Sequence, residues 1–235
     1  MTMRGKDVVI LCGGQGQRLR AVVPETQKVL ARVNGRPFLD ILIGYLKKQG
    51  IQRVVLCTGY KAGQVEEYYR EQTQGLIIEF SREEEALGTG GALKNASHFI
   101  NTDPFFVLNG DSFCAVDLMS LLDFHHSKLA RASIAVSRVD EASAFGGITL
   151  DDSSKIVGFR EKQKEDTPRH VNAGIYCLNE DVFSLMPEER KFSLEYDFFP
   201  NLVGKGFYGF CVKEEFLDIG TPERYRKAKE ILKGE

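Results

Sequence analysis

Residues 11–19, with the sequence LCGGQGQRL, are the part of the chain best suited to bind a phosphate. Glycine lets backbone N–H groups approach a phosphate closely, and Arg18 adds a permanent positive charge. The spacing differs from the Rossmann G-x-G-x-x-G fingerprint, because Leu19 stands where the third glycine would be, and the Gly-Lys-Ser/Thr of a P-loop is absent. Taken alone, the segment is compatible with a phosphate-binding loop or with a tight strand-to-helix turn.

Apolar runs and helix-like segments alternate along the first half of the chain. The runs that predict strands are 8–12, 53–57, 76–80 and 105–108, and the segments that predict helices are 37–49, 64–72, 90–99 and 117–125. This alternation indicates a mainly parallel sheet covered by helices on both faces. Ligands of such sheets bind beyond the carboxyl ends of the strands, where the glycine-rich segment and Asn109-Gly110-Asp111 both fall.

The pattern changes after about residue 131. Residues 133–139, 173–178 and 207–212 resemble strands, residues 147–159 alternate around a turn signal at 151–154, and residues 222–233 predict a closing helix. We therefore predict an α/β fold in one domain, residues 1–235: a single doubly wound, mainly parallel, Rossmann-like sheet with an antiparallel hairpin insertion.

Several further motifs follow the glycine-rich loop in a fixed order. They are Lys28, GRPFL at 35–39, EEALGTGGA at 84–92, NGD at 109–111, Glu161-Lys162, NAGIY at 172–176 and DIGTP at 218–222. With this order, the sequence resembles the sugar-1-phosphate nucleotidyltransferases over almost its whole length. The resemblance implies a glycosyltransferase-A-like nucleotidyltransferase fold, with residues 1–130 mainly binding nucleotide and residues 131–235 mainly binding sugar phosphate.

The reaction of that family defines what the site residues would have to do. A sugar 1-phosphate oxygen attacks the α-phosphorus of a nucleoside triphosphate and pyrophosphate leaves, so cations and a metal matter more than a base. We expect Arg18 and Lys28 to screen the triphosphate, and Asp111 and Asp218 to bind Mg²⁺, which favours carboxylate and phosphate oxygens. The expected catalytic residues are Arg18, Lys28 and Lys162.

The resemblance also implies two sets of binding residues. The expected nucleotide-binding set is Leu11, Gly13, Gly14, Gly16, Arg18, Lys28, Glu83, Gly88, Thr89 and Asp111. In the expected sugar-phosphate set, Glu161 accepts sugar hydroxyls, Lys162 contacts the phosphate, and Gly146 and Asn172 close the pocket.

The residue at position 83 indicates which nucleotide base the site binds. Related enzymes place a polar residue next to the base at this position, five residues before the glycine of the Leu-Gly-Thr segment. A carboxylate accepts hydrogen bonds from both N1–H and N2–H₂ of guanine, whereas uracil and thymine offer a single donor and carry repelling carbonyls. Glu83 therefore favours guanine, and an exposed charge run at 82–85 is the alternative interpretation.

Two local features are most similar to D-glycero-D-manno-heptose 1-phosphate guanylyltransferases. They are RLRAVV at 18–23 and KFSLEYDFF at 191–199. The resemblance implies synthesis of a GDP-heptose for cell-surface polysaccharides. Gln17 and Gln27 depart from the threonine and proline of most relatives, and without that proline we expect a looser loop and a weaker affinity for triphosphate.

Composition excludes several other classes of protein. The chain has 235 residues, of which 43% are hydrophobic, and its net charge of −2 offers no basic surface for nucleic acid. Its longest apolar runs are far shorter than the roughly 18 residues of a membrane span, and no signal-peptide pattern precedes them. We therefore expect a cytoplasmic protein without nucleic-acid or membrane partners; the oligomeric state has no sequence signal.

The cysteines and histidines indicate no chemistry of their own. The five cysteines are an odd number and widely spaced, which predicts buried, reduced thiols and no zinc site. The four histidines lack the motifs of hydrolases and metalloenzymes. The remaining alternatives are a mannose-1-phosphate guanylyltransferase, a uridylyl- or thymidylyltransferase for another sugar, and a non-catalytic nucleotide-sugar sensor.

Overall fold

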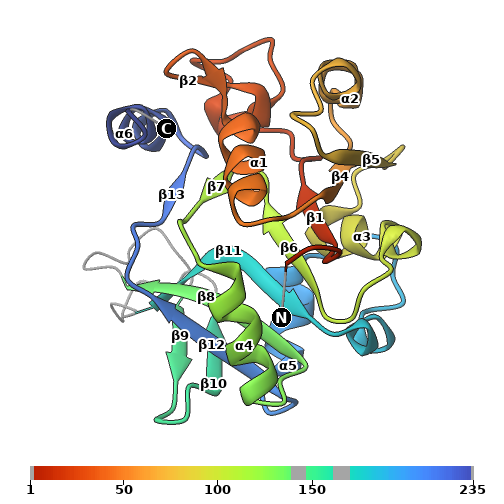
Figure 1. Cartoon of the computed structure of the whole chain (residues 1–235), viewed down its shortest axis with the longest axis vertical. Coiled ribbons are helices and arrows are strands. Elements are labelled where there is room, and N and C mark those ends of the chain that lie inside the picture. Colours follow the sequence, from red (N-terminus) through yellow and green to blue (C-terminus); the bar gives the residue numbers. More distant parts are fainter. Residues whose placement is uncertain (1–2, 139–146, 161–169, 234–235) are drawn as a thin grey trace.

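A nine-stranded sheet forms the centre of the protein, seen here in a computed structural model that describes residues 3–138, 147–160 and 170–233 (Figure 1). Its parallel part runs in the order β5-β4-β1-β6, which comprise Ile77–Arg82, Arg53–Thr58, Val8–Leu11 and Phe105–Asn109. The four strands predicted from the apolar runs in the first half are therefore confirmed, in a doubly wound order.

The second half of the chain extends this sheet beyond β6. Strand β11 (His170–Leu178) pairs antiparallel with β6, β8 (Ala132–Arg138) pairs antiparallel with β11, and β12 (Phe207–Val212) pairs parallel with β8. The predicted hairpin forms from β9 (Gly147–Leu150) and β10 (Ile156–Arg160) and pairs with the start of β11. The mixed sheet confirms the predicted fold class.

Side chains alternate between the two faces of the sheet and build a core on each. Val8 and Ile10 point into one core, with α1 (Phe38–Lys48), α2 (Ala62–Glu71), α4 (Leu118–Ser127) and α6 (Pro222–Ile231). Val9 points into the other, with α3 (Gly88–Asn95), α5 (Phe199–Leu202) and the aromatic segment around Phe192 and Phe198. The sheet is thus buried on both faces, which holds the ends of its strands in fixed positions.

Two short antiparallel pairs lie outside the main sheet, and the sequence pattern does not predict them. Strands β2 (Arg32–Val33) and β3 (Arg36–Pro37) form a small hairpin before α1. Strand β13 (Leu217–Asp218) pairs with β7 (Ser112–Phe113), so Asp218 lies opposite Ser112. Each of these strands has two residues, too few to show a periodicity.

All five cysteines are free thiols. Four are buried, as the sequence predicts, whereas Cys211 is exposed. Among the described residues, no helix combines the length and the apolar character needed to cross a membrane.

Candidate active site

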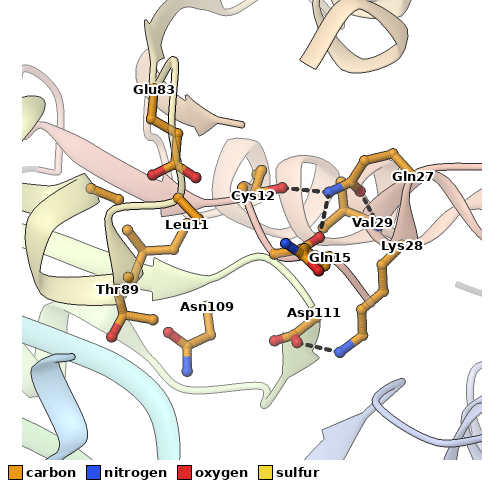
Figure 2. Close-up of a pocket in the computed structure, with 15 residues that line it drawn as sticks. Leu11, Cys12, Gln15, Gln27, Lys28, Val29, Glu83, Thr89, Asn109 and Asp111 are labelled. Atoms are coloured by element: carbon orange, nitrogen blue, oxygen red, sulfur yellow. Dashed lines mark hydrogen bonds and ion pairs between the residues drawn. The ribbon is translucent and has the colours of Figure 1, made fainter. Parts of the chain in front are cut away.

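A cavity of about 270 Å³ opens at the carboxyl ends of β1, β5 and β6 (Figure 2). Of the expected nucleotide-binding residues, it is lined by Leu11, Gly13, Gly14, Lys28, Glu83, Gly88, Thr89 and Asp111. Gln15, Gln27, Val29 and Asn109 also line it. Segments that are far apart in the sequence therefore meet where the strand order predicts a ligand site.

Gln27 anchors the glycine-rich loop. Its side chain is buried, with 1% of the residue exposed, and it donates to the carbonyls of Cys12 and Gly14 while it accepts from the N–H of Val29. Its own N–H donates to Gln64 at 2.7 Å. The expectation of a looser loop is therefore wrong, because side-chain hydrogen bonds replace the rigidity that a proline would supply.

Gln27→Ala is expected to raise KM for the nucleoside triphosphate roughly tenfold. It is also expected to lower the free energy of unfolding by about 2 kcal/mol, because the Cys12 carbonyl and the Val29 N–H lose a buried partner. Steady-state kinetics and urea denaturation measure the two effects. The matched control is Gln49→Ala, which removes similar bonds to Val116 and Leu118 away from the cavity; it should lower stability without changing KM.

Lys28 and Asp111 form an ion pair at one side of the cavity (Figure 2). Lys28 lies in a 3₁₀ turn, Lys28–Leu30, and its side chain is only 11% exposed. Burial would raise the pKa of Asp111, but the Lys28 ammonium and hydrogen bonds from Lys28 and Ser112 outweigh it and hold that pKa below its ordinary value. The Asp111 carboxyl group is thus ionised at neutral pH.

Asp218 and Arg18 lie near this ion pair but do not line the cavity. Arg18 Nη2 and Lys28 Nζ both lie 3.5 Å from the point where Gly220 would carry a Cβ. Asp218 accepts from the Gly220 N–H at 2.7 Å and from Arg224 at 2.6 Å. The β7–β13 pair brings Asp218 beside Asp111, because the N–H of Ile219 donates to the Asp111 carbonyl.

Two neighbouring carboxylates fit a Mg²⁺ ion, which typically takes one or two carboxylates and completes its shell with phosphate oxygens and water. Among the described residues, no group of three or more His, Cys, Asp or Glu side chains could hold a metal unaided. A Mg²⁺ ion at Asp111 and Asp218 would therefore need phosphate oxygens and water to complete its shell.

Glu83 lies at the other side of the cavity and packs on glycine backbone. Added Cβ atoms would lie 2.5 Å from its Oε1 at Gly13 and 2.1 Å at Gly59, so a side chain at either glycine would displace the Glu83 carboxylate. The second carboxylate oxygen accepts from the Leu87 N–H at 3.2 Å. Burial raises the pKa of Glu83 above its ordinary value, with the Leu87 hydrogen bond acting against it.

Helix α3 begins at Gly88 and Thr89, which contact residues 190–195 from the second half of the chain. The Phe192 carbonyl accepts from the N–H groups of Gly90 and Gly91, and a Cβ at Gly88 would lie 2.5 Å from that oxygen. The Thr89 hydroxyl donates to Glu195 at 2.7 Å. The wall of the cavity is therefore joined to the 190–195 segment.

The structure describes only part of the expected sugar-phosphate set. Asn172, on β11, accepts from the Gly174 N–H at 2.8 Å and donates to the Tyr176 hydroxyl at 2.9 Å. Asn172 does not line the cavity itself, but Tyr176 also contacts Asn109, which does. Gly146, Glu161 and Lys162 lie outside the described residues.

Gln27, Asn109 and Glu195, whose side chains make hydrogen bonds at the site, are among the residues absent from the sequence-based predictions of the site. Asn109 stands within the Asn-Gly-Asp motif, directly before the glycine, and this position was the one available signal. The roles of Gln27 and Glu195 depend on hydrogen bonds to distant segments, which sequence order does not contain.

The chain is similar over most of its length to proteins of known name. A D-glycero-alpha-D-manno-heptose 1-phosphate guanylyltransferase from Aneurinibacillus thermoaerophilus is 38% identical over 227 residues, which cover 96% of this chain and 98% of that protein. The enzyme of the same name from Campylobacter jejuni is 36% identical over 220 residues, 92% of this chain and 96% of that protein.

Solved structures show the same fold. HddC from Yersinia pseudotuberculosis superposes with a TM-score of 0.84 at 35% identity, over 96% of this chain and 98% of HddC, and one of its crystal structures is a complex with GMP-PN. The model of the nucleotidyl transferase family matches residues 7–234. This chain therefore belongs to the nucleotidyl transferase family.

Proposed function

We propose that this protein transfers GMP from GTP to D-glycero-D-manno-heptose 1-phosphate, releasing pyrophosphate and GDP-heptose. The observation that carries the proposal is the division of one cavity between Glu83 on one side and the Lys28–Asp111 pair on the other (Figure 2). The Glu83 carboxylate suits the hydrogen-bond donors of guanine, and the positive charges of Lys28 and Arg18 suit a triphosphate. The family membership and the heptose-specific enzymes at 38% and 36% identity support the same reaction.

In this proposal, positioning and charge neutralisation perform most of the catalysis. An oxygen of the sugar 1-phosphate forms a bond to the α-phosphorus of GTP, and the bond from that phosphorus to the bridging oxygen of pyrophosphate breaks. Lys28 and Arg18 neutralise charge on the phosphates. Asp111 and Asp218 would hold Mg²⁺, which would supply further neutralisation of charge at the phosphates.

The sugar phosphate would bind mainly to the second half of the chain, residues 131–235, and the nucleotide mainly to residues 1–130. Asn172 would lie beside the sugar, with Gly146 and Glu161, and Lys162 would contact its phosphate as a third catalytic cation. Reduced, mostly buried cysteines suit a cytoplasmic enzyme, and the product would supply heptose for cell-surface polysaccharides.

The test is pyrophosphate release from a matrix of nucleotides and sugars. GTP, ATP, UTP, CTP and dTTP are each combined with heptose, mannose and glucose 1-phosphates, with Mg²⁺ and with EDTA. We expect rapid release only from GTP with the heptose phosphate, and only with Mg²⁺. A comparable rate with mannose 1-phosphate would favour a mannose-1-phosphate guanylyltransferase, and a comparable rate with UTP would contradict the role of Glu83. No pyrophosphate release from any combination would favour a non-catalytic nucleotide-sugar sensor.

Guanine recognition should depend on pH, because burial raises the pKa of Glu83. Only the ionised carboxylate accepts hydrogen bonds from both guanine donors. The affinity for GTP is therefore highest above the raised pKa and falls as the pH drops through it. We expect KM for GTP to rise on acidification at a higher pH than an ordinary glutamate would cause. Glu83→Gln removes the titrating group, so the same rise in that variant would contradict the assignment.

A further inference from the structure

Asn109 carries a buried acceptor atom that no described residue satisfies. The residue ends β6 and lines the cavity, and its Oδ1 is shielded from solvent without a hydrogen-bond partner (Figure 2). Buried polar atoms of side chains are normally paired, and leaving one unpaired is costly. An unpaired oxygen on the wall of a ligand cavity is where a ligand donor would compensate for that cost.

The orientation of this amide follows from a chain of hydrogen bonds that begins at Glu195. A carboxylate only accepts, and Glu195 accepts from the hydroxyls of Thr89 at 2.7 Å, Ser193 at 2.8 Å and Tyr176 at 3.4 Å. Thr89 and Ser193 in turn accept backbone N–H groups, at 2.9 Å from Leu194 and 3.1 Å from Glu195. All three hydroxyl protons therefore point at one carboxylate.

Because its only proton is used, the Tyr176 oxygen is left as an acceptor. The Asn172 amide donates to it at 2.9 Å, and the Gly174 N–H holds the other end of that amide. Asn109 Nδ2 donates to the same oxygen at 3.4 Å. In this network Asn109 presents its nitrogen to Tyr176, and its oxygen is left without a partner among the described residues.

Gly174 makes the approach of these groups possible. It has a φ of +70°, and a Cβ there would lie 3.1 Å from the Cβ of Asn109. The pairing of β11 with β8 is irregular between Asn172 and Tyr176, and Gly174 lies within this irregular segment. The missing side chain leaves the space in which Asn109 reaches Tyr176.

We propose that Asn109 Oδ1 accepts a hydrogen bond from a hydroxyl group of the sugar phosphate, and that Tyr176 and Glu195 are positioning residues that hold the amide in this orientation. The inference rests on the proposed function, since it needs a sugar phosphate in the cavity. With the base at Glu83 and the phosphates at Lys28 and Asp111, the side of the cavity that holds Asn109 and Thr89 is left for the sugar (Figure 2).

The test pairs Asn109→Leu, which keeps the volume and removes the acceptor, with heptose 1-phosphates that each lack one hydroxyl. For the variant we expect KM for the heptose phosphate to rise about 10- to 100-fold, with KM for GTP changed less than about twofold. With the wild-type enzyme, one of the deoxy sugars should show the same rise in KM that Asn109→Leu causes. With the variant, that sugar should show no further rise, and the hydroxyl that it lacks is then the one that bonds Asn109.

Two further variants make the result independent of simple misfolding. Tyr176→Phe keeps Asn109 but frees its amide to rotate, so KM for the sugar phosphate should rise about three- to tenfold at unchanged KM for GTP. Asn95→Leu removes an amide that bonds Ser81 at the far end of α3, and neither KM should change.

The outcomes separate this inference from the proposed function. Wild-type turnover with the heptose phosphate tests the function alone, and its absence would overturn both. Turnover without coupling to any sugar hydroxyl would overturn the inference only. Coupling instead to 2′- or 3′-deoxy-GTP would also overturn it, and would assign the acceptor to the ribose.

Discussion

Lys28→Met is expected to lower kcat/KM for nucleotidyl transfer about a thousand-fold. The Lys28 side chain is only 11% exposed and its ammonium group lies with Arg18 near Gly220, so its charge acts on bound phosphates with little screening by water. Methionine keeps the length and packing of the side chain but leaves negative charge on the triphosphate uncompensated. Initial rates of pyrophosphate release at several GTP concentrations measure the loss.

The variant also removes the partner of Asp111, so stability must be separated from catalysis. The double variant Lys28→Met/Asp111→Asn contains no unpaired carboxylate at this position and should fold, yet remain as inactive as the single variant. Lys227→Met is the matched control, because that lysine is 59% exposed and pairs with Glu215. Loss of less than tenfold in a folded Lys28 variant would show that Lys28 does not act on the phosphates.

Glu83→Gln is expected to lower kcat/KM for GTP about a hundred-fold, while the low rate with UTP changes by less than about threefold. Two hydrogen bonds from guanine to a charged acceptor contribute roughly 1.5–3 kcal/mol each, and glutamine keeps the shape of the side chain but can accept only one of them. The preference for guanine over uracil should therefore shrink by about two orders of magnitude. Competition between GTP and UTP for one heptose phosphate measures it directly.

Two other substitutions define this prediction more sharply. Glu84→Gln removes an exposed neighbouring carboxylate and should leave base preference unchanged, which tests the alternative of a simple charge run. Gly59→Ala keeps the Glu83 charge but would place a Cβ 2.1 Å from Oε1, so it must displace the carboxylate. If that variant retained full preference for GTP, the position of Glu83 would not matter to the base.

The fold followed from sequence pattern wherever elements were long enough to carry a period. The apolar runs of β1, β4, β5 and β6 and the helix-like segments between them predicted the parallel part of the sheet, and the turn at 151–154 predicted the β9–β10 hairpin. The two-residue strands β7 and β13 carried no such signal. Yet their pairing places Asp218 beside Asp111, so the least predictable elements position the expected metal ligands.

The candidate site, like the fold, was only partly predictable from the sequence. The family resemblance carried by the order of motifs predicted Lys28, Glu83 and Asp111 as residues of one site, and all three line the cavity. Gln27 was interpreted wrongly, since the absence of a proline says nothing about the hydrogen bonds that a buried amide makes with Cys12 and Val29.

By itself, the sequence determined the fold class, the family and the chemical types of the site residues. Only the tertiary structure decided which group faces which: that Glu83 rests on Gly13 and Gly59, and that Asn109 shares Tyr176 with Asn172. The physical reason is that hydrogen-bond direction and burial depend on contacts between segments far apart in the chain. Local periodicity describes each segment separately and holds no record of those contacts.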